Sequence, residues 1–174
     1  MPSSRVLPQL VKAVAVSKPR RDTWLVEELL DAFIVWDEGV RVERTRFPGV
    51  LLVISEKLDP QSIVRLASRL EFSFMSRLVP ATIAVEVENL NQLLEKLVEV
   101  IGGSGVHEFK LQAVVRGDGK TVVSESQLRA ALEKMNFRVA GNARKVLAVE
   151  SIDRLFVATL GEVRKCGYNC KLIA

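Results

Sequence analysis

The chain has 174 residues, of which 48% are hydrophobic and 26% are charged, the profile of a folded protein with one ordinary domain or two small ones. Its longest purely apolar run, Val50–Ile54, is far shorter than the ~20 residues of a membrane-spanning helix, and Pro8 and Lys12 interrupt the only candidate signal peptide. These features exclude an intrinsically disordered chain and predict a cytoplasmic protein without membrane contact.

The first half of the chain alternates between strand and helix patterns. Strands are predicted over residues 12–17, 40–46, 50–55 and 77–87. Helices are predicted over 22–33, with Asp22 as the N-cap, and over 59–70, where Asp59 is the N-cap and Pro60 the first helical residue. The order β-α-β-β-α-β predicts a ferredoxin-like unit, with both helices on one face of an antiparallel sheet.

The second half follows a different order. A helix is predicted over 89–103, a strand over 108–116, a turn at "GDG", and a helix over 124–135 that begins with a capping box of Ser124 and Gln127. Strands over 144–151 and 154–160 form a hairpin. The resulting α-β-α-β-β order places the domain boundary near Glu88. We therefore expect an α+β protein with domains at residues 1–88 and 89–174.

The excess of positive charge lies entirely in the second half. Residues 1–88 contain 12 lysines and arginines and 12 acids, whereas residues 89–174 contain 13 and 9, which accounts for the net charge of +4. Such an asymmetry indicates an anionic partner for the second half, and nucleic acid is the commonest one. The alternative is a solvated surface on which lysines and arginines are scattered.

Catalytic motifs are absent from the sequence. The segment "IGGSGVHEF" (101–109) has three glycines and the only histidine, His107, but it follows a predicted helix and precedes a strand. Phosphate-binding loops run in the opposite sense, from a strand into the N-terminus of a helix. We therefore expect a binding module and no enzyme, with no catalytic residue, no metal site and no cofactor.

The two cysteines, Cys166 and Cys170, are too few for a zinc site, which needs about four ligands. In an extended strand their Cα atoms would be roughly 13 Å apart, so a disulfide requires a turn, for which Gly167 and Asn169 are suitable. In a reducing cytosol the expectation is two free thiols.

Basic side chains of the second half are the candidates for phosphate contacts, because arginine and lysine supply the charge and hydrogen bonds that phosphate requires. The segment "FRVAGNARK" (137–145) contributes three of them and contains no acid. The candidates are Lys110, Arg116, Lys120, Arg129, Arg138, Arg144, Lys145, Arg164 and Lys165. If they lie on separate faces, their role is solubility alone.

Two stretches resemble a known family. "FPGVLLVISEKLDPQSIVRLASRL" followed by "RLVPA" resembles the N-terminal unit of stand-alone THUMP proteins that assist cytidine acetylation in transfer RNA. "FKLQAVVRGDGKTVVSESQLRAALEKMNFRV" followed by "KVLAVESIDRLFVATL" is similar to the THUMP strand, helix and closing hairpin. The resemblance covers roughly residues 10–161.

The resemblance implies that the two units together bind the acceptor end of tRNA while a separate enzyme performs the chemistry. Because no methyltransferase, pyrophosphatase or deaminase domain is attached, we expect an adaptor that presents tRNA to its enzyme. Many THUMP proteins have a cluster of lysine and arginine where this chain has "VVRGDGK", which Asp118 interrupts, and this weakens the transfer of the contact role to Arg116 and Lys120.

Two other functions are compatible with the sequence. An acylphosphatase-like hydrolase would use the loop "SKPRRD" (17–22), with Arg20 as the anion-binding residue, although Pro19 removes one amide donor. A ligand-sensing regulatory domain would dimerise through the edge of its sheet.

Overall fold

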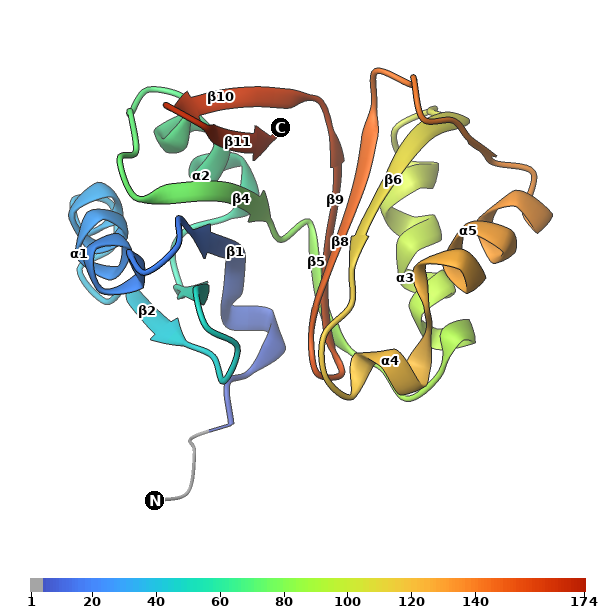
Figure 1. Ribbon diagram of the computed structural model, residues 1–174, viewed down its shortest axis with the longest axis horizontal. Helices are drawn as coiled ribbons and strands as arrows, with labels where there is room; N and C mark the ends of the chain where they lie inside the picture. Colours follow the sequence, from blue (N-terminus) through green and yellow to red (C-terminus); the bar gives the residue numbers. More distant parts are fainter. Residues whose placement is uncertain (1–4) are drawn as a thin grey trace.

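The computed structural model describes residues 5–174 as two β-sheets with helices on their outer sides (Figure 1). Helices α1 (Asp22–Phe33) and α2 (Pro60–Ala67) cover the first sheet, and α3 (Leu90–Gly102) and α5 (Glu125–Lys134) cover the second. The faces of the two sheets that carry no helix pack against each other. The fold class is α+β, as predicted.

The first sheet contains the predicted ferredoxin-like unit. Its strands lie in the order β10-β11-β4-β1-β3-β2, and each neighbouring pair among β4, β1, β3 and β2 is antiparallel. The bounds of these strands are β1 (Val11–Ser17), β2 (Arg41–Arg44), β3 (Val50–Ile54), β4 (Met75–Pro80), β10 (Val163–Gly167) and β11 (Cys170–Ile173). Asp59 caps α2 as predicted, by accepting a hydrogen bond of 2.7 Å from the backbone N–H of Ser62.

Asp22 is not the N-cap that the sequence predicted. It is the first residue of α1, and Arg21 precedes the helix without a side-chain cap. The carboxylate of Asp22 instead accepts a hydrogen bond from Arg44 of β2, which draws it away from the amides of the first turn.

The strand predicted over 77–87 is two strands in two different sheets. After β4 the chain leaves the first sheet at Ala81, and β5 (Ile83–Glu86) pairs antiparallel with β9 of the second sheet. The alternation of side chains along the sequence could not separate the two strands, because every strand has the same period of two residues whichever sheet it joins. Thr82 in the link donates to or accepts from Thr159 at 2.8 Å, which ties the crossing point to β9.

The second sheet has the order β5-β9-β8-β6-β7. The bounds of its other strands are β6 (Glu108–Val114), β7 (Arg138–Val139), β8 (Val146–Ile152) and β9 (Leu155–Gly161). The predicted capping box of Ser124 and Gln127 is present on α5. The "GDG" turn leads into a short helix, α4 (Gly119–Val122), that the sequence did not predict.

The C-terminal hairpin of β10 and β11 returns to the first sheet. β11 lies parallel to β4, so residues 163–173 extend the sheet of the first unit although they follow the second unit in sequence. The domain boundary near Glu88 stays a prediction. A division at that residue would separate β10 and β11 from the sheet to which they belong. None of the helices within residues 5–174 is long and apolar enough to cross a membrane.

The expectation of two free thiols is wrong in this structure, because Cys166 and Cys170 form a disulfide. The turn between β10 and β11 brings their Cα atoms to 5.0 Å. Gly167 and Asn169 make this turn possible, with φ angles of 143° and 49°. Both cysteines are buried in the core of the first unit.

Reduction of this disulfide is expected to lower the free energy of unfolding by about 2 kcal/mol. The reason is that the unfolded chain regains the conformational entropy that closing a loop of about five residues had removed. Urea denaturation with and without reductant measures the effect. A variant with both Cys166→Ser and Cys170→Ser should match the reduced protein and should not respond to reductant. An unchanged midpoint on reduction would show that the disulfide does not form in solution.

Asp153 in the β8–β9 turn connects the two units. Its carboxylate accepts hydrogen bonds from Arg46, at 2.9 Å to Nε, and from the backbone N–H of Asp118 at 3.0 Å. The Arg46 guanidinium, and secondarily the Asp118 amide, hold the pKa of Asp153 below its ordinary value. Gly117 suits the position beside it, because its φ of 57° is one that other residues rarely adopt.

Asp153 should therefore contribute stability above pH ~4, the ordinary pKa of aspartate, and this contribution should be lost as the pH falls through the lower pKa of the folded state. Asp153→Asn is expected to be less stable than wild type at neutral pH and to converge with it in acid. Thermal melts from pH 7 to pH 2.5 would measure this. Asp31→Asn, an exposed position on α1, is the control. A difference that does not narrow in acid would contradict the assignment.

Candidate RNA-binding surface

Three basic residues lie side by side across neighbouring strands of the first sheet. Lys165 of β10 pairs with Lys171 of β11, and Lys171 pairs with Arg77 of β4, so the three side chains project from the same face. This face is turned toward the second sheet, because Arg77 reaches Glu150 of β8 with an Nε–Oε1 distance of 2.7 Å. Like charges directly opposite each other destabilise a sheet, so this row favours a bound anion.

The second sheet adds further positive charge at the same junction. Lys110 lies on β6 with its side chain on the face opposite Phe109 and Leu111, which are buried against the helices. Arg116, just after β6, donates from Nη1 to Oε2 of Glu150 at 2.7 Å. The carboxylate of Glu150 therefore lies between the guanidinium groups of Arg77 and Arg116, and its side chain is only 1% exposed.

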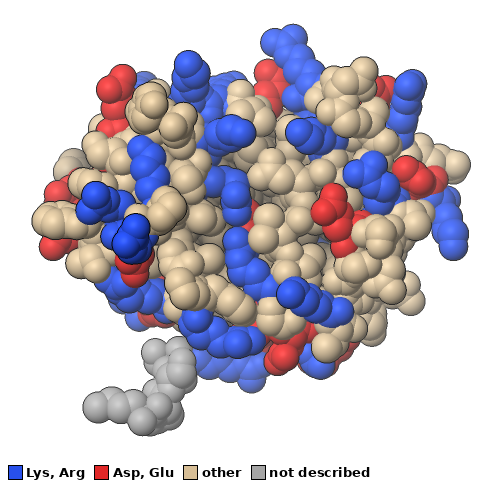
Figure 2. All heavy atoms as spheres, viewed as in Figure 1, with Lys and Arg blue, Asp and Glu red and all other residues tan. Residues whose placement is uncertain are grey.

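We call the five residues Arg77, Lys110, Arg116, Lys165 and Lys171 the basic strip. Within residues 5–174, Glu150 is their one ion-pair partner, and it pairs with Arg77 and Arg116. Lys110, Lys165 and Lys171 are exposed and have no ion pair in this part of the chain. Figure 2 shows lysine and arginine side chains running down the middle of the molecule, where Figure 1 places the junction of the two sheets.

The predicted basic segment 137–145 adjoins the basic strip, but its three cations pair with acids of neighbouring segments. Arg138 lies 3.6 Å from Glu108, and Glu162 lies 3.3 Å from Arg144 and 3.4 Å from Lys145. The backbone N–H of Lys110 donates to the carbonyl of Lys145 at 2.8 Å, which joins the segment to the strip. Arg144 is highly exposed, so its ion pair is weak and can exchange for a phosphate.

The other predicted contact residues lie elsewhere. Arg129 is on α5 and pairs with Glu125 at 3.9 Å, and Lys120 lies beside Val115 and Glu125 on the helical side of the second sheet. Arg164 is on the opposite face of β10 from Lys165, because it pairs with the buried Leu172. The nine predicted residues therefore do not form one surface.

Sequence reasoning missed arginines of the first half. Arg65 of α2 and Arg69, in the turn just after that helix, line a cavity of about 480 Å³ together with Arg164, at the ends of β4 and β11. None of these three arginines has an ion pair in the part of the chain that the structure describes. Arg77 and Lys171 were also missed, since neither stands in a conspicuously basic segment.

The loop proposed for an acylphosphatase-like activity has few free amides. The backbone N–H of Lys18 donates to the carbonyl of Phe74 at 2.8 Å, and the backbone N–H of Arg21 donates to the carbonyl of Lys18 at 3.1 Å. These two groups are therefore not available to bind an anion. His107 is an exposed loop residue, as predicted, and residues 5–174 contain no cluster of three His, Cys, Asp or Glu side chains suited to a metal.

No protein-family model matches the chain, and no curated protein matches it in sequence. Solved structures match its fold. PH1313 from Pyrococcus horikoshii Ot3 is 14% identical with a TM-score of 0.61, over 90% of this chain and 56% of that one. A 4-thiouridine synthetase in complex with RNA and ATP is 16% identical with a TM-score of 0.55, over 90% and 42%. TrmN from Thermus thermophilus is 15% identical with a TM-score of 0.57, over 85% and 44%.

These likenesses show a shared fold across both units of the chain. The chain spans 42–56% of the length of the three proteins. It therefore corresponds in structure to a part of each.

Proposed function

We propose that the chain is a THUMP-type RNA-binding module that holds tRNA for a modification enzyme. The observation that carries this proposal is the row of Lys165, Lys171 and Arg77 on the first sheet, with Lys110 on the facing side of the second, and three of these four cations have no ion pair in residues 5–174. A surface of this kind binds phosphate groups irrespective of sequence, which suits a protein that must hold many tRNAs.

The comparisons support the same class of ligand. The 4-thiouridine synthetase structure contains RNA, and this chain shares its fold over 90% of the chain's length. The resemblance to the stand-alone THUMP proteins supports the finer part of the proposal, in which the chain is a non-catalytic adaptor for cytidine acetylation and contacts the acceptor end of tRNA. Its enzyme partner would then be a separate protein, and both would work in the cytoplasm.

Fluorescence anisotropy with labelled tRNA tests the proposal. We expect binding at about 50 mM salt that weakens by several orders of magnitude by about 200 mM if six or more phosphates are contacted. A DNA duplex of equal charge is the control, because recognition of the A-form shape and the 2′-hydroxyls should favour RNA. Absence of tRNA binding at low salt would contradict the proposal.

A further inference from the structure

Tyr168 stands at the tip of the C-terminal hairpin, and its side chain has almost no protein contact. The residue is 83% exposed, although tyrosine rings usually cover apolar surface. Within the described residues the ring makes a cation–π contact with Lys18, whose Nζ lies 5.6 Å from the ring centroid. No packing role therefore explains an aromatic residue at this position.

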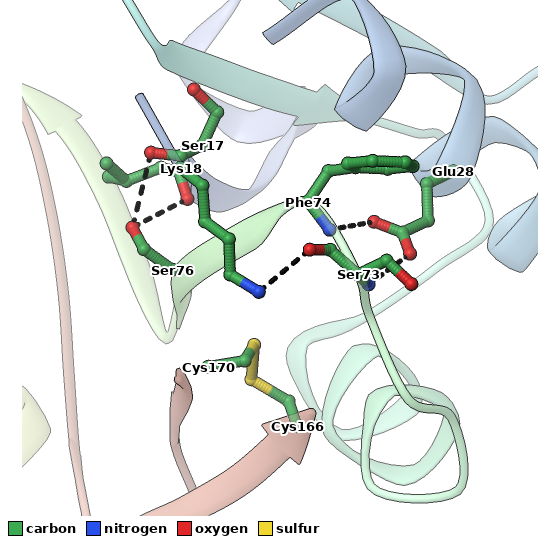
Figure 3. Close-up of a disulfide and its surroundings, with 9 residues drawn as sticks. Ser17, Lys18, Glu28, Ser73, Phe74, Ser76, Cys166 and Cys170 are labelled. Carbon is green, nitrogen blue, oxygen red and sulfur yellow. Dashed lines mark hydrogen bonds between the residues drawn. A yellow bond between two sulfur atoms is a disulfide. The ribbon is translucent and has the colours of Figure 1, made fainter. Parts of the chain in front are cut away.

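The tip that carries Tyr168 is rigid. The disulfide, drawn in Figure 3, joins the residues two positions before and two positions after it, and both cysteines are buried. The carbonyl of Cys166 also accepts a hydrogen bond of 2.7 Å from Phe72, which fixes the hairpin to the loop before β4. A ring held on such a base loses little conformational entropy when it binds a ligand.

The surroundings of the ring are positively charged. Lys18, whose Nζ lies near the ring, also donates a hydrogen bond of 2.8 Å to the carbonyl of Ser73, which Figure 3 shows as a dashed line. Arg20 and Arg21 are exposed in the same loop and have no ion pair within residues 5–174. Lys165, three residues before Tyr168 on the same hairpin, belongs to the basic strip. The ring therefore stands where the strip meets a second group of cations.

We propose that Tyr168 stacks on an unpaired base of the RNA that lies along the basic strip, with the flanking phosphates on Lys18 and Lys165. This inference rests on the proposed function. Proteins bind single-stranded nucleic acid with exposed aromatic rings beside cations. The rings stack on the flat faces of the bases, and the cations pair with the negative phosphates between them. A base inside a duplex is covered on both faces by its neighbours, so the ligand is a nucleotide outside the helix.

The test compares two RNAs and three variants. One RNA is a hairpin with a single-stranded tail of four nucleotides, and the other is the same hairpin with a blunt end. Tyr168→Ala should weaken binding of the tailed RNA about tenfold, within the range for one stacked base, and change binding of the blunt RNA less than about twofold. Tyr168→Phe should bind as wild type, since the ring is kept. Trp36→Ala, another exposed aromatic residue, should have no effect on either RNA.

Failure of the inference and failure of the proposed function give different results. If wild type binds the tailed RNA and Tyr168→Ala binds it equally well, the stacking role is wrong and the RNA-binding proposal stands. Equal weakening for both RNAs would also overturn stacking on an unpaired base. If wild type binds neither RNA at low salt, both proposals are wrong.

Discussion

Replacing Glu150 with alanine is expected to lower the free energy of unfolding by about 3 kcal/mol. The carboxylate is 1% exposed and pairs with Arg77 and Arg116, whose side chains are 23% and 13% exposed. Removing one partner of a buried ion pair typically costs 3–5 kcal/mol, because it leaves an uncompensated charge. Arg77 can partly return to water, so we expect the lower end of that range. Urea denaturation measures the loss.

Glu162→Ala is the matched control. Glu162 also pairs with two cations, Arg144 and Lys145, but these are far more exposed, so the loss should stay below about 1 kcal/mol. Similar small losses in both variants would show that Glu150 does not organise the junction between the sheets.

The substitution of Lys110, Lys165 and Lys171 with glutamine is expected to reduce tRNA affinity by on the order of 100-fold at about 0.1 M salt. Loss of three phosphate contacts should also flatten the log–log salt dependence by about two to nearly three units. Stability should not fall, because Lys165 and Lys171 are like charges on directly paired positions. Anisotropy titrations over a series of salt concentrations measure both quantities.

The control replaces three cations of the second unit's helices, Lys96, Arg129 and Lys134, with glutamine. It removes the same charge from α3 and α5, on the outer side of the second sheet (Figure 1). Its affinity and salt dependence should stay close to those of wild type. Equal losses in the two triple variants would mean that net charge, and not the basic strip, governs binding.

The elements of the chain could largely be predicted from local patterns, because helix spacing, strand alternation and caps are local properties. Asp59 and the capping box at Ser124 are examples that the structure confirms. Features that depend on distant pairing could not be predicted. The strand over 77–87 divides between two sheets, and the C-terminal hairpin returns to the first sheet across the whole second unit.

The candidate surface could be predicted only in part, for a related reason. The sequence places the excess of positive charge in residues 89–174. Which cations can bind phosphate, however, depends on the ion pairs that they form in the folded protein. Arg44 and Arg46 are engaged by Asp22 and Asp153, whereas Arg65 and Arg69 in the same half have no such partner in the described chain. Arg77 joins Lys171 only because β11 lies beside β4, a contact between segments nearly a hundred residues apart.

The most direct test of the central claim is to map backbone amide chemical shifts by two-dimensional NMR during titration with a tRNA acceptor-stem hairpin. The protein of 19.3 kDa is small enough for this measurement. If RNA binds along the basic strip, the largest shift changes should fall on β4, β6, β10 and β11, around Arg77, Lys110, Lys165 and Lys171. Shift changes confined to the outer surfaces of α1, α3 and α5, with these four strands unperturbed, would contradict it.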